Sequence, residues 1–295
     1  MCIGLACYTS AEEMLNSVQL LAWLGNRFGK PRGFERVVRC FASPEKCGTM
    51  PELCLVREGF VFLARPGVQV DWNVLFFGTY EPEVRRIFRA VLPLGGVALD
   101  IGANVGWHTL LMASLVGATG RVIAVEANPV LRQRLQDHLC VNHFGQVDVV
   151  SCAAADSEGM MEFYAPAANA PDSGDGHVVE FGTGEPGGTL VETRRLDAIV
   201  HGSAVDRVDL VKIDVEGFEW RVLQGGEATI TKFRPHIVFE YNAESASRGS
   251  GTPELISEFF RGHRYQLFAI GQNLAKAIEG GSWPRSAEIW AVPLC

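Results

Sequence analysis

From residue 97 onward, the chain alternates short apolar runs with segments of helical periodicity. Strands are expected at 97–102, 121–127, 147–154, 208–215 and 236–242, and helices at 107–117, 129–143 and 217–231. Strands separated by helices are typical of a parallel sheet with helices on both faces. The last two apolar runs, 264–271 and 287–294, are expected to form an antiparallel hairpin at the edge of that sheet. The sequence therefore predicts an α/β fold with a mostly parallel, Rossmann-like sheet.

Residues 1–92 follow a different pattern and are predicted to be an N-terminal extension that covers the substrate or the cofactor. A helix is expected at 10–28, two β-rich runs at 53–77 and a second helix at 78–92. Residues 93–295 form the predicted main domain, which contains an insert at 165–188 rich in glycine, proline and alanine. A connection of that length is either disordered or a functional lid, and its expected position near the site favours a lid.

The charge and the apolar content exclude several classes of function. With a formal net charge of -8 and no basic stripe, the chain is not expected to bind nucleic acid. The longest apolar runs are shorter than the roughly 20 residues of a membrane-spanning helix, and the N-terminus lacks the pattern of a secretion signal. The eight cysteines include no Cys-x-x-Cys pair, so a zinc site is not expected. We expect a cytoplasmic protein that acts on a small molecule, with a homodimer left open.

The turn "DIGANVG", at residues 100–106, places an acid and two glycines after the first strand of this sheet. Such a turn lies at the carboxyl edge of a parallel sheet, where ligands bind. Without Cβ atoms, Gly102 and Gly106 are expected to let backbone N–H groups approach a ligand. The spacing is not Gly-x-Gly-x-x-Gly, and Asp100 would repel a pyrophosphate, so a ligand with a cationic group is favoured. S-adenosylmethionine carries two such groups; a structural glycine turn is the alternative.

Acidic and small residues follow the next two expected strands. Glu126 ends the second strand, where a carboxylate can accept hydrogen bonds from both hydroxyls of a ribose. Ala153 and Ala154 leave room beside an adenine ring, and Asp156 is placed to accept a hydrogen bond from the adenine amine. A turn formed by Asp156 and its neighbours is an equally good interpretation. Together these residues fit an adenosine that is joined to a cation.

The chain resembles, in six segments and in their order, the FkbM-type S-adenosylmethionine-dependent methyltransferases. The segments are "GTYEPEV", "LDIGANVGWHT", "GRVIAVEANP", "RRLDAIV", "VDLVKIDVEGFEWRVLQGG" and "RPHIVFEYN", within residues 78–242. The resemblance implies a class I methyltransferase fold, O-methylation of a small molecule such as a sugar or a natural product, and a cofactor covered by Tyr80 and Glu81. The predicted cofactor-binding residues are then Tyr80, Glu81, Asp100, Gly102, Ala103, Asn104, Gly106, Thr109, Glu126, Asn128, Ala153, Ala154, Asp156 and Asp214.

Acids also end the fourth and fifth expected strands, at the same edge as the glycine turn. Asp214 and Glu216 follow one strand, and Glu240 and Asn242 end the other. Methyl transfer to a hydroxyl requires a group that takes up the hydroxyl proton, and these acids are candidates.

Two interpretations of these acids stay open. In one, Asp214, Glu240 and Asn242 hold Mg²⁺, which lowers the pKa of the acceptor hydroxyl. In the other, no metal takes part: Asp214 or Glu216 is the base or binds the ammonium of the cofactor, and Glu240 orients the acceptor. The second interpretation is favoured because oxygen ligands of a divalent cation have no diagnostic spacing.

Two further residues have predicted roles. His108, in the first turn after the glycine loop, is a catalytic candidate because imidazole titrates near neutral pH, with a packing role as the alternative. Lys212 is interpreted as a structural residue paired with a neighbouring acid.

Two other functions are alternatives to methyl transfer. An NAD-dependent oxidoreductase is disfavoured by the missing Gly-x-Gly-x-x-Gly. A non-catalytic adenosyl-binding module would need no acids at Asp214 and Glu240.

Overall fold

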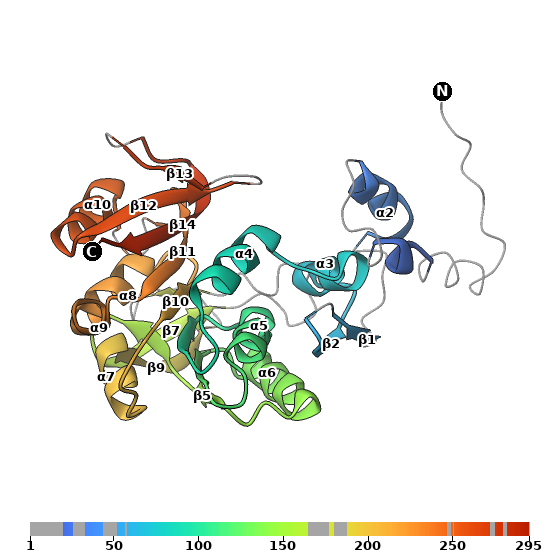
Figure 1. Cartoon of the computed structure of the whole chain (residues 1–295), viewed down its shortest axis with the longest axis horizontal. Coiled ribbons are helices and arrows are strands. Elements are labelled where there is room, and N and C mark those ends of the chain that lie inside the picture. The colour runs from blue at the N-terminus through green and yellow to red at the C-terminus, as the bar shows by residue number, and fades with distance from the viewer. Residues whose placement is uncertain are drawn as a thin grey trace. The chain divides into compact units, whose positions relative to one another are not determined.

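The computed structural model in Figure 1 describes most of the chain. The described residues are 20–25, 33–43, 52–56, 58–164, 177–179, 188–246, 249, 251–271, 275–279 and 282–294. Their contacts divide the chain into two units, of which the first runs to Tyr80 and the second begins at Glu81. The expected helix at 78–92 is found as α4 (Pro82–Val91), and it belongs by these contacts to the second unit.

The described residues of the first unit contain a β-hairpin, two helices and further helical residues at 20–25, within the helix expected at 10–28. The elements are α2 (Phe34–Ala42), β1 (Glu52–Leu55), β2 (Val61–Ala64) and α3 (Gln69–Phe77). Trp72 is fully buried, and its Nε1 donates a hydrogen bond to the carbonyl oxygen of Ala42 at 2.5 Å. The prediction of a strand at the end of 53–77 is wrong, because α3 occupies that position. Most residues of α3 are buried, and a short run buried on all sides has no periodicity that separates a strand from a helix.

The second unit is built on an eight-stranded sheet. Its strands are β3 (Val97–Ile101), β4 (Arg121–Val125), β5 (Val147–Val150), β10 (Leu210–Ile213), β11 (His236–Asn242), β12 (Tyr265–Ile270), β13 (Ala275–Ala277) and β14 (Ser286–Pro293). The spatial order is β13-β12-β14-β11-β10-β3-β4-β5. The five strands from β5 to β11 are parallel, whereas β14, β12 and β13 pair antiparallel. The predicted mostly parallel sheet and C-terminal hairpin are confirmed.

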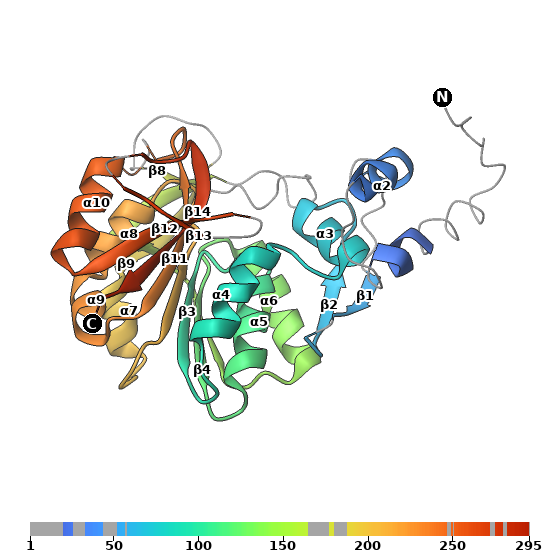
Figure 2. The same ribbon diagram turned by 45° about the horizontal axis from the view of Figure 1, so that its top comes forward.

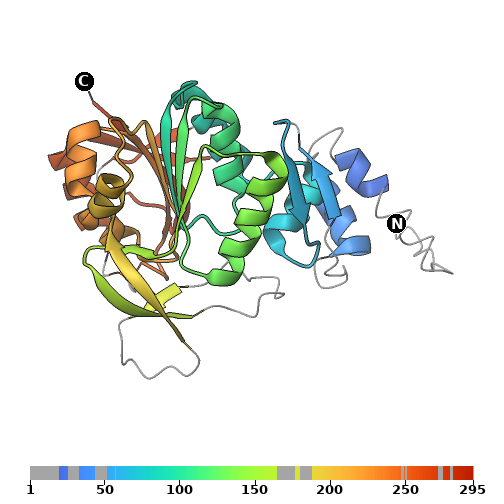
Figure 3. The same cartoon turned by 90° about the horizontal axis from the view of Figure 1, so that it is seen from below.

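Helices cover both faces of this sheet (Figure 2). On one face lie α4, α5 (Trp107–Val116) and α6 (Pro129–Asn142). The other face carries α7 (Leu196–Gly202), α8 (Glu219–Gly225), α9 (Glu227–Phe233) and α10 (Pro253–Gly262). Figure 3 shows the same layers from below. The helix expected at 217–231 is found as two short helices, α8 and α9, that meet at Gly226.

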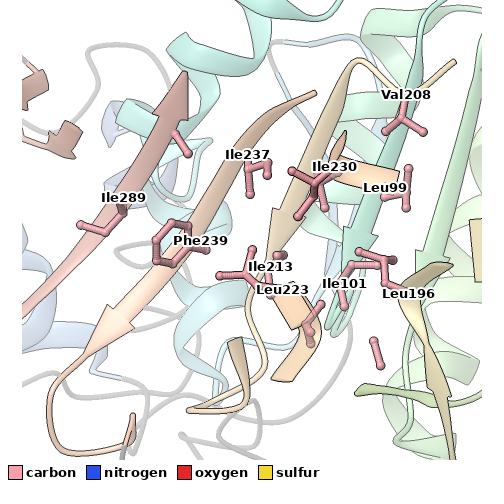
Figure 4. Close-up of a cluster of buried hydrophobic side chains, with 14 of the residues drawn as sticks. Leu99, Ile101, Leu196, Val208, Ile213, Leu223, Ile230, Ile237, Phe239 and Ile289 are labelled. Carbon is pink, nitrogen blue, oxygen red and sulfur yellow. The ribbon is translucent and has the colours of Figure 1, made fainter. Parts of the chain in front are cut away.

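The two faces of the central strands differ in polarity. The face toward α7–α10 carries a large apolar cluster that includes Leu99, Ile213 and Phe239 (Figure 4). Side chains of a strand alternate between faces, so their neighbours Asp100, Lys212 and Glu240 point toward the side of α4 and α5. The apolar face stabilises the sheet, and the opposite face carries the charged side chains that are available for binding or catalysis.

A second, four-stranded sheet accompanies the first. Its strands are β6 (Ala153–Ala155), β7 (Gly159–Tyr164), β8 (His177–Val179) and β9 (Thr189–Arg195), in the order β6-β9-β7-β8. The single strand expected at 147–154 is therefore wrong, because β5 and β6 belong to different sheets. The insert predicted as a lid lies outside the described residues, apart from β8 and Gly188.

Candidate active site

The glycine turn and the segment after β10 meet at the carboxyl edge of the sheet. Strands β3 and β10 are adjacent and parallel, with Asp100 paired to Lys212 and Ile101 to Ile213. A Cβ atom on Gly102 would lie 1.8 Å from the carbonyl oxygen of Asp214. Gly102 also has a φ of +81°, which favours glycine. The glycine at this position is required because the backbone of the neighbouring motif occupies the space of a side chain.

The N–H groups of the turn are hydrogen-bonded within the protein. Gly102 N and Ala103 N both donate to the carbonyl oxygen of Val125 at 3.0 Å, and Gly106 N donates to Ala103 at 2.8 Å. Asn104 N donates to Glu126 Oε2 at 2.7 Å. The expectation that Gly102 and Gly106 free these N–H groups for a ligand is therefore wrong.

Glu126 organises the turn with both of its carboxylate oxygens. Oε2 accepts from Asn104 N, and Oε1 accepts from Asn128 N at 2.7 Å. The side chain of Asn128 in turn caps α6 by accepting from Val130 N. Burial raises the pKa of Glu126 to about 7, although both backbone donors act to lower it. Glu126 thus lies at the tip of β4, as predicted, and it connects the glycine turn to the start of α6.

Asp100 lies below the turn and is almost fully buried. Its Oδ2 accepts a hydrogen bond from Thr109 Oγ1 at 2.5 Å. Burial raises the pKa of Asp100 to about 6, while the Thr109 hydrogen bond and the charge of Lys212 act to lower it. Asp100 and Thr109, both predicted cofactor residues, therefore form one buried pair that joins β3 to α5.

The remaining predicted cofactor residues lie in three places. Ala153 and Ala154 are buried in β6, and Asp156 follows that strand with Oδ1 3.8 Å from Arg221. Tyr80 ends the first unit. Glu81 begins the second unit at the N-terminus of α4, with a left-handed φ of +45° that is unusual for a glutamate. Its Oε2 lies 3.4 Å from His108 Nε2, so Glu81 is close to the start of α5.

Three predicted acids gather at the ends of β10 and β11. Oxygen atoms of Asp214, Glu216 and Glu240 lie within 4.8 Å of one another. Glu216 has a φ of +53°, a strained conformation for a residue with a long side chain. Asn242, by contrast, uses its Oδ1 to accept from Glu244 N at 2.9 Å and caps a turn.

A buried cation lies beside these acids. Lys212 has 0 % exposure, and its Nζ lies 3.2 Å from Asp214 Oδ2 and 3.3 Å from Glu288 Oε1. The prediction that Lys212 pairs with a neighbouring acid is confirmed, but it pairs with two. Glu288 comes from β14, where it faces Glu240.

The pKa values of Asp214 and Glu240 are shifted in opposite directions. Burial acts to raise the pKa of Asp214, but the charge and the hydrogen bond of Lys212 lower it below its usual value. Burial and the charges of Asp214, Glu216 and Glu288 raise the pKa of Glu240 to about 9. Near neutral pH the site therefore contains an ionised Asp214 next to a protonated Glu240.

These residues do not fit a divalent cation. Asp214 already contacts the ammonium of Lys212, and this buried positive charge opposes the binding of a second cation beside it. Asn242, the third predicted ligand, already uses its Oδ1 to accept a hydrogen bond from Glu244 N. We therefore derive no step that uses Mg²⁺.

His108 is neutral in this structure. Burial and the charge of Lys212 lower its pKa to about 3, so the expectation that it titrates near neutral pH is wrong. Its ring packs edge-on against Phe88 at 5.5 Å between centroids. The approach of His108 Nε2 to Glu81 therefore joins a neutral ring to a carboxylate and is not an ion pair. Because its ring is buried and packs against Phe88, a packing role fits these contacts better.

A model of a known protein family matches the part of the chain that contains this site. The family model described as "Methyltransferase FkbM domain" matches residues 100–267, more than half of the chain. The chain belongs to the FkbM methyltransferase family. The matched range begins at Asp100 and includes Glu126, Asp214 and Glu240. The resemblance inferred from the six sequence segments is confirmed.

Individual relatives of this FkbM methyltransferase match parts of it. The antimetabolite synthetase AmbE of Pseudomonas aeruginosa is 30% identical over 210 residues, which are 60% of this chain and 10% of AmbE. The 2-O-methyltransferase NoeI of Sinorhizobium fredii is 28% identical over 196 residues, 56% of this chain and 75% of NoeI. The chain thus spans about a tenth of the length of AmbE.

Solved structures resemble the fold at low sequence identity. A methyltransferase FkbM from Methylobacillus flagellatus is 14% identical with a TM-score of 0.43, over 95% of this chain and 58% of that one. A precorrin-6y C5,15-methyltransferase from Geobacter metallireducens is 15% identical with a TM-score of 0.40, over 72% and 90%. The fold itself is the mostly parallel sheet with helices on both faces described above. None of the described helices combines the length and apolar character that a membrane crossing requires.

Two further acids beside this site, Glu288 and Glu219, were not predicted from the sequence. Glu288 lies in a run expected to form only the outer hairpin, and nothing local links it to Lys212. Glu219 accepts from Val215 N at 3.2 Å and Gly217 N at 3.1 Å, and so holds the turn that presents Asp214. The one available signal is a lysine between apolar residues in "LVKI", since a buried lysine requires acidic partners.

Proposed function

We propose that this FkbM methyltransferase transfers a methyl group from S-adenosylmethionine to a hydroxyl group of a small molecule. The observation that carries the proposal is the acid group of Asp214, Glu216 and Glu240 at the sheet edge, one backbone contact away from the glycine turn. Parallel strands end at this edge, so a ligand on the turn and an acceptor beside the acids would be neighbours.

The residues of the turn fit the proposed donor. Acids lie at the ends of three adjacent strands, at Asp100, Glu126 and Asp214, and a ligand that carries positive charge would favour their ionised forms. Glu126 at the tip of β4 is placed to accept hydrogen bonds from a ribose. When bound, S-adenosylmethionine supplies the methyl group: its carbon–sulfur bond breaks as the bond to the acceptor oxygen forms.

The acids of this chain divide the remaining work. Asp214 is ionised at neutral pH and takes up the hydroxyl proton as the acceptor oxygen is methylated. Glu240 is protonated and can donate a hydrogen bond that orients the acceptor. Glu216 completes the group of acids. Hydroxyl acceptors agree with the name of the relative NoeI, a 2-O-methyltransferase.

A two-stage experiment tests the proposal. Calorimetry with S-adenosylmethionine and with NAD identifies the cofactor; binding of NAD alone would favour the oxidoreductase alternative. Transfer of labelled methyl groups is then measured across panels of sugars, other polyhydroxylated natural products and amines. Methylation of a hydroxyl supports the proposal, and methylation of amines only contradicts it. Binding of S-adenosylmethionine with no transfer to any acceptor would favour a non-catalytic module.

A further inference from the structure

Lys212 lies at the centre of the sheet with no access to solvent. It belongs to β10, between β3 and β11, and its Cα partners are Asp100 and Val238. A lysine in such a position is costly to bury unless its charge is compensated. Two carboxylates compensate this charge. Lys212 Nζ lies 3.2 Å from Asp214 Oδ2 and 3.3 Å from Glu288 Oε1.

These two partners come from distant parts of the chain. Asp214 is two residues from Lys212 on the same side of β10, whereas Glu288 lies on β14, beyond the intervening strand β11. Glu288 also lies beyond residue 267, where the match to the FkbM family model ends. An ammonium held only by Asp214 would be free to move with it. The second contact, from a different strand, gives the ammonium one fixed position.

The groups that face Lys212 are mostly acidic. They are Asp214 on its own strand, Glu240 on β11, Glu288 on β14, Asp100 on β3, Glu81 at the start of α4 and His108 on α5. Burial acts to lower the pKa of Lys212, but the charges of Asp214, Glu288, Glu81 and Glu240 raise it well above its usual value. Lys212 therefore keeps its positive charge at neutral pH, and it lies beside the group of Asp214, Glu216 and Glu240.

We propose that Lys212 is a positioning residue for methyl transfer: it ties Asp214 to Glu288 and thereby fixes the carboxylate of Asp214 at the sheet edge. The inference rests on the proposed role of Asp214 as the proton acceptor. Proton transfer requires the two heavy atoms to be within hydrogen-bonding distance. Displacement of Asp214 by as little as an ångström would therefore slow the reaction while the cofactor site stays intact.

A purely structural role for Lys212 makes a different prediction. In that case the lysine only neutralises buried acids, and removal of Lys212 and Glu288 together restores the charge balance. The double variant Lys212→Met, Glu288→Gln separates the two roles, because it removes one positive and one negative group at once. It also remains informative where Lys212→Met alone fails to fold.

The first experiment compares the wild type, Lys212→Met, the double variant and Lys276→Met. Lys276 is an exposed lysine of β13 and serves as the control, with unchanged turnover expected. For the double variant we expect a normal unfolding midpoint and normal S-adenosylmethionine affinity, but a kcat about 100-fold below that of the wild type. The KM for the acceptor should change little. Recovery of kcat together with stability would overturn the positioning role.

The second experiment does not depend on turnover, so it separates failure of this inference from failure of the proposed function. The carboxyl carbon of Asp214 is followed by ¹³C NMR in the wild type and in the double variant. We expect Asp214 to stay ionised to lower pH in the wild type, and to titrate at higher pH once its cation is removed. Identical titration of Asp214 in the two proteins would overturn the contact on which the inference rests, whether or not an acceptor is known.

Discussion

The carbonyl oxygen of Asp214 lies 1.8 Å from the position that a Cβ atom on Gly102 would occupy. The glycine turn after β3 and the acidic segment after β10 are therefore in backbone contact. Asp214 N also donates to the carbonyl oxygen of Ile101 at 2.9 Å, one residue before Gly102. The place where the proposed methyl donor binds and the acid proposed to accept the proton are thus positioned by one local arrangement.

Replacement of Gly102 by alanine should disturb both motifs. Gly102→Ala adds a Cβ against a backbone atom at a φ of +81°, and we expect a loss of stability of about 3 kcal/mol or more. Gly95→Ala is the matched control, because Gly95 has a φ of +75° but its nearest contact would be Thr119 Oγ1 at 3.4 Å. Backbone strain alone should cost Gly95→Ala about 1 kcal/mol. Equal losses in denaturant unfolding would show that the contact with Asp214 is unimportant.

Removal of the Glu126 carboxylate should weaken cofactor binding. Glu126→Ala removes a group that accepts from Asn104 N and Asn128 N and that is proposed to hold the ribose. The expected loss of S-adenosylmethionine affinity is on the order of 2 kcal/mol or more, measured by calorimetry. Glu158→Ala, at an exposed acid of the same unit, should bind normally. Unchanged affinity of Glu126→Ala would contradict the ribose assignment.

The left-handed backbone of Glu216 predicts that its replacement by glycine raises stability and lowers activity. Glycine adopts a φ of +53° more easily than glutamate, so Glu216→Gly should stabilise the fold by about 0.5 kcal/mol while it lowers turnover. Ala204→Gly relieves a similar φ of +51° at an exposed position and should leave turnover unchanged. Thermal unfolding and methyl-transfer rates measure the two effects. A Glu216→Gly variant with full activity would remove Glu216 from the site.

The protonated state of Glu240 predicts the alkaline limit of activity. Since the pKa of Glu240 is raised to about 9, its carboxyl group is a donor below that pH and loses its proton above it. Turnover should therefore fall as the pH rises through about 9. Glu240→Gln keeps a donor at all pH values, so its rate should show no fall in this range. A wild-type rate that rises through pH 9 would instead indicate that the ionised Glu240 is the base.

Chelation should leave the reaction intact. Lys212 already contacts Asp214, so we expect turnover to be unchanged by EDTA and unaffected by added Mg²⁺. Loss of activity in EDTA with recovery on addition of Mg²⁺ would restore the metal interpretation.

Asp214→Asn, which removes the proposed proton acceptor, should lower kcat by about 100-fold or more while S-adenosylmethionine binding is retained. A double variant Asp214→Asn, Glu240→Gln with the wild-type rate would exclude both interpretations.

Local pattern determined much of this protein. The alternation of apolar runs and helical segments predicted the parallel sheet, its flanking helices and the C-terminal hairpin. The acids at the ends of the expected strands predicted that Asp214, Glu216 and Glu240 would lie close together, because parallel strands share one carboxyl edge. These features depend on periodicity and chain direction, which a sequence contains in full.

Only the tertiary structure decided what depends on neighbours from elsewhere in the chain. The run that forms α3 is buried on most sides, so its periodicity does not separate a strand from a helix, and in the structure it is a helix that contacts β2. The N–H groups of the glycine turn are bonded to Val125 and Glu126, because β4 lies beside that turn. Glu288 reaches Lys212 from a strand 76 residues away in the sequence. The pKa values of the acids follow from that cation and from burial, which arise only when the strands assemble.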